Sequence, residues 1–165
     1  MTLTIRRTRP RGHPAGNGAE VVHLLDRLVR NVEHGRFERA LSALTAAAAV
    51  VTGTEIFLEH DSASFSNRMM WVPIALTPLV TAAGIGGVFS KRIAKTALPA
   101  VSAVVVANGL QGTYLHMRGI GERPGGWRLP RYNIEMGPPL LAPLLFTMVG
   151  GMGILAAILR REARG

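Results

Sequence analysis

The chain has 165 residues, a formal net charge of +9 and no cysteine. Without cysteine it cannot form a disulfide, a thiolate zinc site, an iron–sulfur cluster or a thiol nucleophile. Hydrophobic residues make up 48% of the sequence and charged residues only 18%, and almost all of the charge lies between long uncharged apolar runs. This distribution is typical of a membrane protein, although the net charge alone would suggest nucleic acid as a partner.

The first 18 residues form a basic arm rich in arginine, proline and glycine. This composition cannot bury a core, so the arm alone is expected to be disordered. It predicts contact with anionic lipid headgroups or with a partner subunit. A nucleic-acid partner is not favoured, because no aromatic residues are interleaved with the basic ones. The arginines concerned are Arg6, Arg7, Arg9 and Arg11.

Residues 19–35 have the spacing of a short amphipathic helix. Apolar residues recur at helical intervals, and charged residues lie on the opposite face. We expect this helix to lie on the cytoplasmic face of the membrane or to dock onto a neighbouring subunit, with Leu24 and Leu28 on the contacting face.

Four apolar runs predict four transmembrane helices, at residues 40–58, 69–90, 96–115 and 136–159. A bilayer core about 30 Å thick requires roughly 20 mostly apolar residues per helix. Glu55 is the only charged residue within these runs. The sequence therefore predicts an all-α protein in which residues 37–159 form a four-helix membrane bundle, followed by a basic tail at residues 160–165.

Lysine and arginine are distributed unequally between the two ends of these predicted helices. The segments before the first run, between the second and third, and after the fourth hold 14 of the 19, and the other two loops hold five. Because positive residues are retained on the cytoplasmic side, we expect both termini in the cytoplasm.

The two halves of the membrane region resemble each other, which suggests a parallel repeat of two helical hairpins. Matching residues are 56 positions apart in the first and third runs and 65 apart in the second and fourth. Chance is the alternative explanation, because glycine and proline are common in this sequence. The pairs include Gly53 with Gly109, Glu55 with Gln111, His60 with His116, Pro73 with Pro138 and Pro78 with Pro143.

Polar side chains gather near the outer ends of the first and third runs. Glu55 is the only acidic residue inside a run, and such a residue is unfavourable unless it is paired or faces water. We expect it to pair with Gln111 or with Arg118. Asn108 is the other polar residue that approaches the middle of the membrane.

His60 and His116 occupy matching positions of the repeat and are the candidate cofactor ligands. Two imidazoles can hold a b-type haem, or can join nearby carboxylates in a metal site. Their interfacial positions count against haem, and the lack of Glu-x-x-His spacing counts against a metal. The simpler expectation is two histidines with structural hydrogen bonds and no cofactor. We assign no catalytic residue, since no nucleophile occurs in a recognisable catalytic motif.

Several segments, mainly in the second half of the chain, resemble a loose set of small bacterial membrane proteins with no assigned activity. The resemblance implies a bacterial inner-membrane setting and no particular site residue. It is carried by the segments His116 to Gly119, Gly125 to Trp127, Tyr132 to Asn133, Gly137 to Pro139 and Ala142 to Leu144.

Three functions remain open from the sequence. The first is a non-catalytic subunit of a larger inner-membrane complex of electron transport, with membrane lipids and other membrane subunits as partners. The second is a small redox carrier that binds haem b or reacts with quinone through His60 and His116. The third is a small homo-oligomeric transporter in which Glu55 and Asn108 line the path.

Overall fold

The computed structural model describes residues 21–23 and 35–160, and all regular structure within them is helical. Four of the helices are long and apolar enough to cross a membrane, which confirms the prediction of an all-helical chain with four such helices. The basic arm, Leu24, Leu28 and the tail beyond residue 160 lie outside the described residues. The four long helices are α2 (Arg36–Ser62), α3 (Trp71–Phe89), α5 (Ala97–Gly121) and α7 (Ala142–Leu159).

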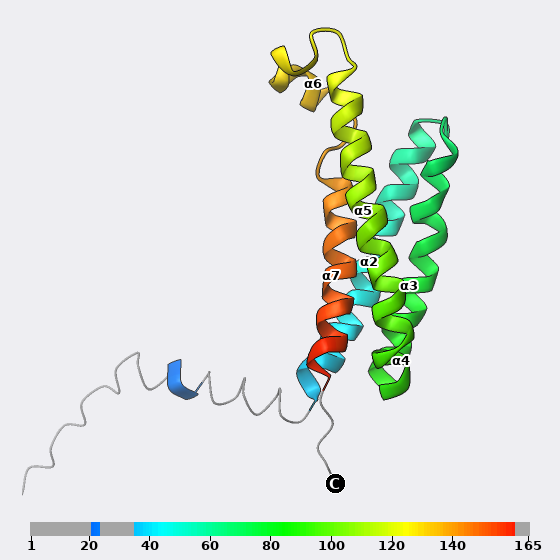
Figure 1. The fold of residues 1–165 in the computed structure, drawn as a ribbon, viewed down its shortest axis with the longest axis vertical. Helices are drawn as coiled ribbons and strands as arrows, with labels where there is room; N and C mark the ends of the chain where they lie inside the picture. Colours follow the sequence, from blue (N-terminus) through cyan, green and yellow to red (C-terminus); the bar gives the residue numbers. More distant parts are fainter. Residues whose placement is uncertain (1–20, 24–34, 161–165) are drawn as a thin grey trace, which may run out of the picture.

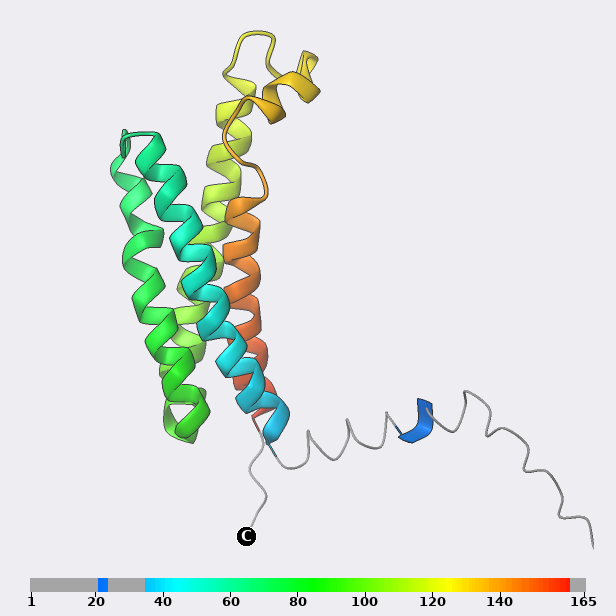
Figure 2. The same cartoon turned by 180° about the vertical axis from the view of Figure 1, so that it is seen from behind.

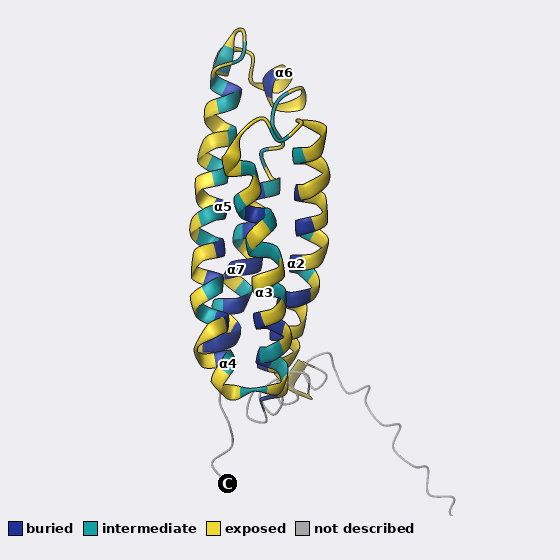
Figure 3. Ribbon diagram, turned by 90° about the vertical axis from the view of Figure 1, so that its right-hand side faces the viewer, coloured by how far each residue is buried: buried dark blue, intermediate teal, exposed yellow. Residues whose placement is uncertain are grey.

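Helices that follow one another in the chain pack as two hairpins, α2 with α3 and α5 with α7 (Figures 1 and 2). Because α2 also contacts α7 and α3 also contacts α5, the four helices enclose one core. Figure 3 shows buried residues on the inward helix faces and exposed residues facing outward. Many of the outward residues are large and apolar, as expected of surfaces that face lipid. The core contains Ala49, Ile56, Val80, Val105, Phe146 and Val149.

The helices differ from the predicted runs at the end of the bundle that carries His60 and His116, which we call the outer end. α5 continues to Gly121, six residues past the predicted limit, and α7 begins only at Ala142, six residues after the predicted start. Gly137, Pro138 and Pro139 explain the late start. Proline lacks an amide hydrogen, and the residue before a proline avoids the helical conformation. Residues 136–141 are therefore non-helical.

Each hairpin is held together by a glycine that packs against a threonine. A Cβ atom at Gly53 would collide with the side chain of Thr77, and one at Gly109 would collide with Thr147. Small residues at such points let two membrane helices approach closely. The same type of contact is thus used once in each hairpin.

The two threonines also identify equivalent positions in α3 and α7. The hydroxyl of Thr77 donates to the carbonyl of Pro73 at 2.8 Å, and that of Thr147 donates to the carbonyl of Pro143 at 3.0 Å. In these contacts the equivalent residues are 70 positions apart. The expected offset of 65 is therefore not the one that the packing uses, because the non-helical segment before α7 displaces its start.

Two cationic side chains bind the C-terminal carbonyls of helices at the opposite, inner end. Lys95, the last residue of α4 (Lys91–Lys95), donates from Nζ to the carbonyl of Ala157 in α7 at 2.6 Å. Arg160 donates from Nη1 to the carbonyl of Gly87 in α3 at 3.1 Å. Cations at helix C-termini satisfy unpaired carbonyls and offset the helix dipole.

A short excursion connects α5 to α7 at the outer end. It contains the 3-10 turn η2 (Gly126–Arg128) and the helix α6 (Pro130–Glu135), which lies beside the tip of α5 (Figure 1). The buried Asn133 holds the excursion closed, since its Nδ2 donates to the carbonyls of Pro124 at 3.2 Å and Gly126 at 2.8 Å.

Candidate functional site

A pocket of about 940 Å³ lies between the two hairpins at the outer end. Its walls come from the end of α2, the 3-10 turn η1 (Arg68–Met70), the start of α3, the second half of α5 and the non-helical segment before α7. The innermost lining is apolar, because Ile56 and Phe146 also belong to the core. Histidine, amide and charged side chains line the outer part.

The pocket brings together four of the residues that the sequence singled out. His60, Asn108, Gln111 and His116 all line it. Both histidines and Asn108 are half-buried, and Gln111 is exposed. Residues from the two hairpins thus face one cavity, with His60 on α2 and the other three on α5.

Glu55 lies outside this pocket. It is exposed on α2 and forms no hydrogen bond or ion pair with another described residue. The expected pairing with Arg118 is wrong, because Arg118 Nε lies 2.7 Å from Oε1 of Glu122, the residue that follows the end of α5. The alternative pairing with Gln111 is also not formed.

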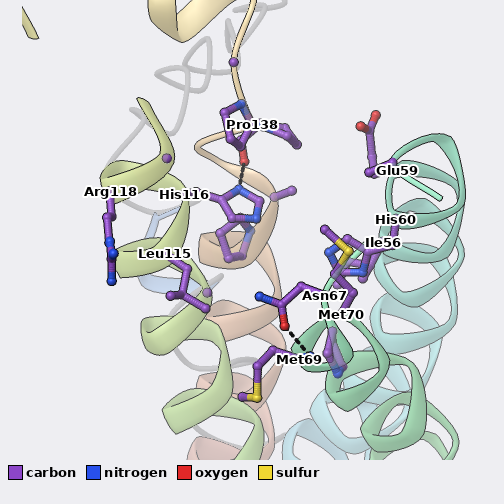
Figure 4. Close-up of a pocket in the computed structure, with 18 of the residues that line it drawn as sticks. Ile56, Glu59, His60, Asn67, Met69, Met70, Leu115, His116, Arg118 and Pro138 are labelled. Atoms are coloured by element: carbon purple, nitrogen blue, oxygen red, sulfur yellow. Dashed lines mark hydrogen bonds between the residues drawn. The ribbon is translucent and has the colours of Figure 1, made fainter. Parts of the chain in front are cut away.

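His116 is fixed by the non-helical segment before α7. Its Nδ1 lies 2.8 Å from the carbonyl oxygen of Pro139, which has no helical partner of its own. A carbonyl oxygen can only accept, so Nδ1 carries the hydrogen, and in the neutral ring Nε2 keeps its lone pair. Figure 4 shows the ring between α5 and Asn67, with its second nitrogen on the pocket side. The segment therefore orients an unoccupied acceptor.

His60 is held by aromatic contacts on the opposite wall. Its ring meets the ring of Phe65 edge-on at 6.2 Å, and Phe65 stacks on Trp71 at 4.2 Å. Its Nδ1 is buried and has no hydrogen-bond partner among the described residues. This atom is therefore covered by its neighbours and is not open to the pocket.

Asn67 is a pocket residue that the sequence reasoning missed. Its Oδ1 accepts the amide hydrogen of Met69 at 2.9 Å and caps the turn η1. Because the oxygen is the acceptor, Nδ2 is the group that points across the pocket toward α5 in Figure 4. An asparagine just before an apolar run is a known capping signal, and this signal could have identified the residue.

The formal charges that line the pocket cancel. Glu59 and Glu122 oppose Arg118 and Arg123, and the Arg118–Glu122 pair is already formed. With the histidines neutral, the lining offers hydrogen bonds without a net charge. Such a site suits a neutral head group better than a phosphate or a carboxylate.

No larger metal-binding group accompanies the histidines. Within residues 21–23 and 35–160, no cluster of three or more histidine, aspartate or glutamate side chains is placed to hold a metal ion. His60 and His116, one from each hairpin, are the residues that would hold a haem iron.

No protein-family model, curated protein or solved structure matches the chain. A function is therefore inferred from the pocket and from the surfaces around it.

Proposed function

We propose that this chain is a subunit of a bacterial inner-membrane complex of electron transport and that its outer pocket binds a lipid-soluble molecule with a polar head group. The pocket carries the proposal, because it combines an apolar interior with a rim of histidine, amide and charged side chains. Sites for small ligands are concave and mostly apolar, with a few polar groups that fix the ligand's orientation. Quinones are redox molecules of this amphipathic kind.

Haem b is the second candidate ligand. A histidine that binds a metal commonly donates its other ring hydrogen to a carbonyl, which fixes the ring, and His116 makes such a bond to Pro139. His60 would supply the second ligand from the other hairpin. Haem would be recognised by its visible absorption, which a quinone lacks.

The proposed fold is a parallel repeat of two hairpins about an axis along the membrane normal, with both termini in the cytoplasm. The glycine–threonine contacts support it, as does the burial pattern of the first and third helices. Five buried residues of α4 and α5 each lie 56 positions after a buried residue of α2. The pairs are Glu38 with Ala94, Ser42 with Leu98, Ala46 with Ser102, Ala49 with Val105 and Gly53 with Gly109.

The exposed Glu55 supports membership in a larger complex. An acidic side chain on a lipid-facing surface is unfavourable, and a donor group on a neighbouring subunit would remove that penalty. Glu55→Gln keeps the shape of the side chain, and Glu55→Leu removes its polar atoms. We expect native mass measurements to show partner loss with Glu55→Leu and retention with Glu55→Gln. Retention with both variants would contradict a partner contact at Glu55.

Transport is not the function we propose. Directly beneath the pocket, the inward faces of the bundle are closely packed, and Val80, Val105, Phe146 and Val149 are at most 1% exposed.

Blocking the pocket tests the proposal. The protein would be purified in mild detergent, and its visible spectrum, native mass and extractable lipids would be recorded. Leu115 lines the pocket, so Leu115→Trp places a larger side chain in the space for the ligand, whereas Leu110 is exposed on the same helix and does not line the pocket. We expect a lipid-soluble ligand with the native protein and with Leu110→Trp, and its loss with Leu115→Trp. The proposal would be contradicted if no lipid-soluble ligand were recovered from the native protein and Leu110→Trp. It would also be contradicted if the native protein and both variants gave equal amounts of ligand. A Soret band would identify haem.

A further inference from the structure

Two hydrogen-bonding atoms of opposite character, neither bonded to another residue of the described part of the chain, face the pocket. The Nε2 atom of His116 is an acceptor, because Nδ1 donates to Pro139. The Nδ2 atom of Asn67 is a donor, because Oδ1 accepts from Met69. Both side chains extend into the space between the hairpins (Figure 4). The head group that fits must therefore both donate and accept.

We infer that the pocket is a hydroquinone site, in which a quinol hydroxyl donates to His116 Nε2 and a quinol oxygen accepts from Asn67 Nδ2. This inference rests on the proposed function, namely that the pocket holds a lipid-soluble molecule. A quinol hydroxyl both donates and accepts, so it satisfies both protein atoms. The oxidised quinone has only carbonyl oxygens, which would face the lone pair of Nε2 without a hydrogen between them.

The lining also suits the rest of such a molecule. A quinol is neutral, as is the sum of the formal charges of Glu59, Glu122, Arg118 and Arg123. Apolar side chains, including Leu115 and Phe146, can cover its ring and the first part of its tail. Arg118, one of the two lining arginines, is already paired with Glu122 and is therefore not free to bind the anionic head of a phospholipid or fatty acid.

The binding of three related probes tests the inference. A short-chain ubiquinol, the corresponding ubiquinone and an alkylbenzene with a tail of equal length would be titrated by calorimetry into the full chain in lipid nanodiscs, with empty nanodiscs as the blank. The titrations are made at about pH 8, where an ordinary histidine is neutral. We expect the quinol to bind roughly tenfold more tightly than the quinone, a ratio that corresponds to about one hydrogen bond, and the alkylbenzene to bind most weakly.

Two substitutions separate the acceptor from the donor. In His116→Asn the new amide can still donate to Pro139, but no acceptor remains at the position of Nε2. In Asn67→Asp the carboxylate still accepts from Met69, but the amide donor is lost. We expect His116→Asn to weaken quinol binding to the level of quinone. We expect Asn67→Asp to weaken quinone binding most, because a quinone carbonyl cannot donate to the new carboxylate whereas a quinol hydroxyl can. Tyr114→Phe is the control, because Tyr114 is exposed on α5 and does not line the pocket.

The outcomes separate this inference from the proposed function. Equal binding of quinol and quinone to the native protein would overturn the inference, whether or not the variants fold. Equal binding of the alkylbenzene would overturn it as well, while leaving a pocket for lipid-soluble molecules. If none of the three probes binds, the inference is overturned. The proposed function would still stand in that case, provided that a lipid-soluble ligand is recovered with the native protein in the Leu115→Trp experiment.

Discussion

At the residue scale, the contact of Gly109 with α7 leaves no room for a side chain. A Cβ atom there would lie 2.8 Å from the carbonyl oxygen of Pro143 and from the amide nitrogen of Thr147, and nearer still to the Thr147 hydroxyl. Backbone atoms cannot move aside as a flexible side chain can. A single added methyl group therefore has to separate α5 from α7 at the pocket floor.

We expect Gly109→Ala to lower the free energy of unfolding by about 1–3 kcal/mol, the usual cost of overpacking. Gly151→Ala is the matched control, because a Cβ atom at Gly151 has nothing within 4 Å and alanine favours a helix over glycine. Thermal unfolding in detergent would compare the two. An equal change in both variants would show that the contact does not limit packing.

Lys95 supports a second prediction at this scale. Removing its amine in Lys95→Met leaves the Ala157 carbonyl at the end of α7 without its donor, at a cost of about 0.3–1 kcal/mol. We expect faster hydrogen exchange in the last turn of α7 and no change at the end of α3, which Arg160 binds. Arg92→Met, an exposed change in the same short helix, should leave both ends unaffected.

Individual residues also show what the sequence could and could not predict. His60 and His116 could be identified as a pair from the sequence, because they are separated by the same 56 positions as the other matching residues of the first and third runs. The pairing of Glu55 with Arg118 failed because rotation about the helix axis decides which residues meet, and Glu122, one turn away, is a nearer partner. Asn67 was missed because its role depends on which of its two amide atoms the cap occupies.

At the element scale, the bounds of the helices follow the apolar runs except at the outer ends of α5 and α7. α2 and α3 agree with the apolar runs within a few residues, whereas α7 loses its first six residues to the Gly-Pro-Pro segment. Hydropathy detects burial in lipid and is insensitive to a missing amide hydrogen. The carbonyl of Pro139, freed in this way, is what holds His116.

The excursion that contains α6 depends on Asn133. In Asn133→Asp the buried amide donor becomes a carboxylate that faces the carbonyl oxygens of Pro124 and Gly126. An unsatisfied buried group of this kind costs at least about 1–3 kcal/mol. We expect limited proteolysis to cut residues 122–136 more rapidly, while the thermal stability of the four long helices remains unchanged.

Glu135→Gln is the control for that experiment, since Glu135 is exposed at the end of α6. If both variants resist the protease like the native protein, then the Asn133 hydrogen bonds do not hold the excursion closed.

At the scale of the whole molecule, the class of protein was predictable from hydropathy, while the register between helices was not. Apolar composition accumulates over some 20 residues and tolerates local irregularity. Register depends on single contacts such as Gly53 with Thr77, and a run of similar apolar residues carries too little information to define it. The offset between α3 and α7 was wrong by five residues for this reason.

The orientation of the chain in the membrane is open to a direct measurement. The sequence has no cysteine, so a single introduced thiol can be labelled without background. From the excess of lysine and arginine, we expect a membrane-impermeant maleimide to label Ser66→Cys in intact cells. Arg92→Cys, at the other end of the bundle, should react only after the membrane is opened. The reverse pattern would invert the proposed topology.

The ring contacts at the outer end have an optical consequence. The chain has two tryptophans, and both lie at this end, Trp71 in α3 and Trp127 in η2. Trp71 stacks on Phe65, which in turn meets the ring of His60 on the pocket wall. The tryptophan fluorescence of the chain therefore originates at the outer end, so the emission of the purified protein in nanodiscs can report occupancy of the pocket without any attached dye.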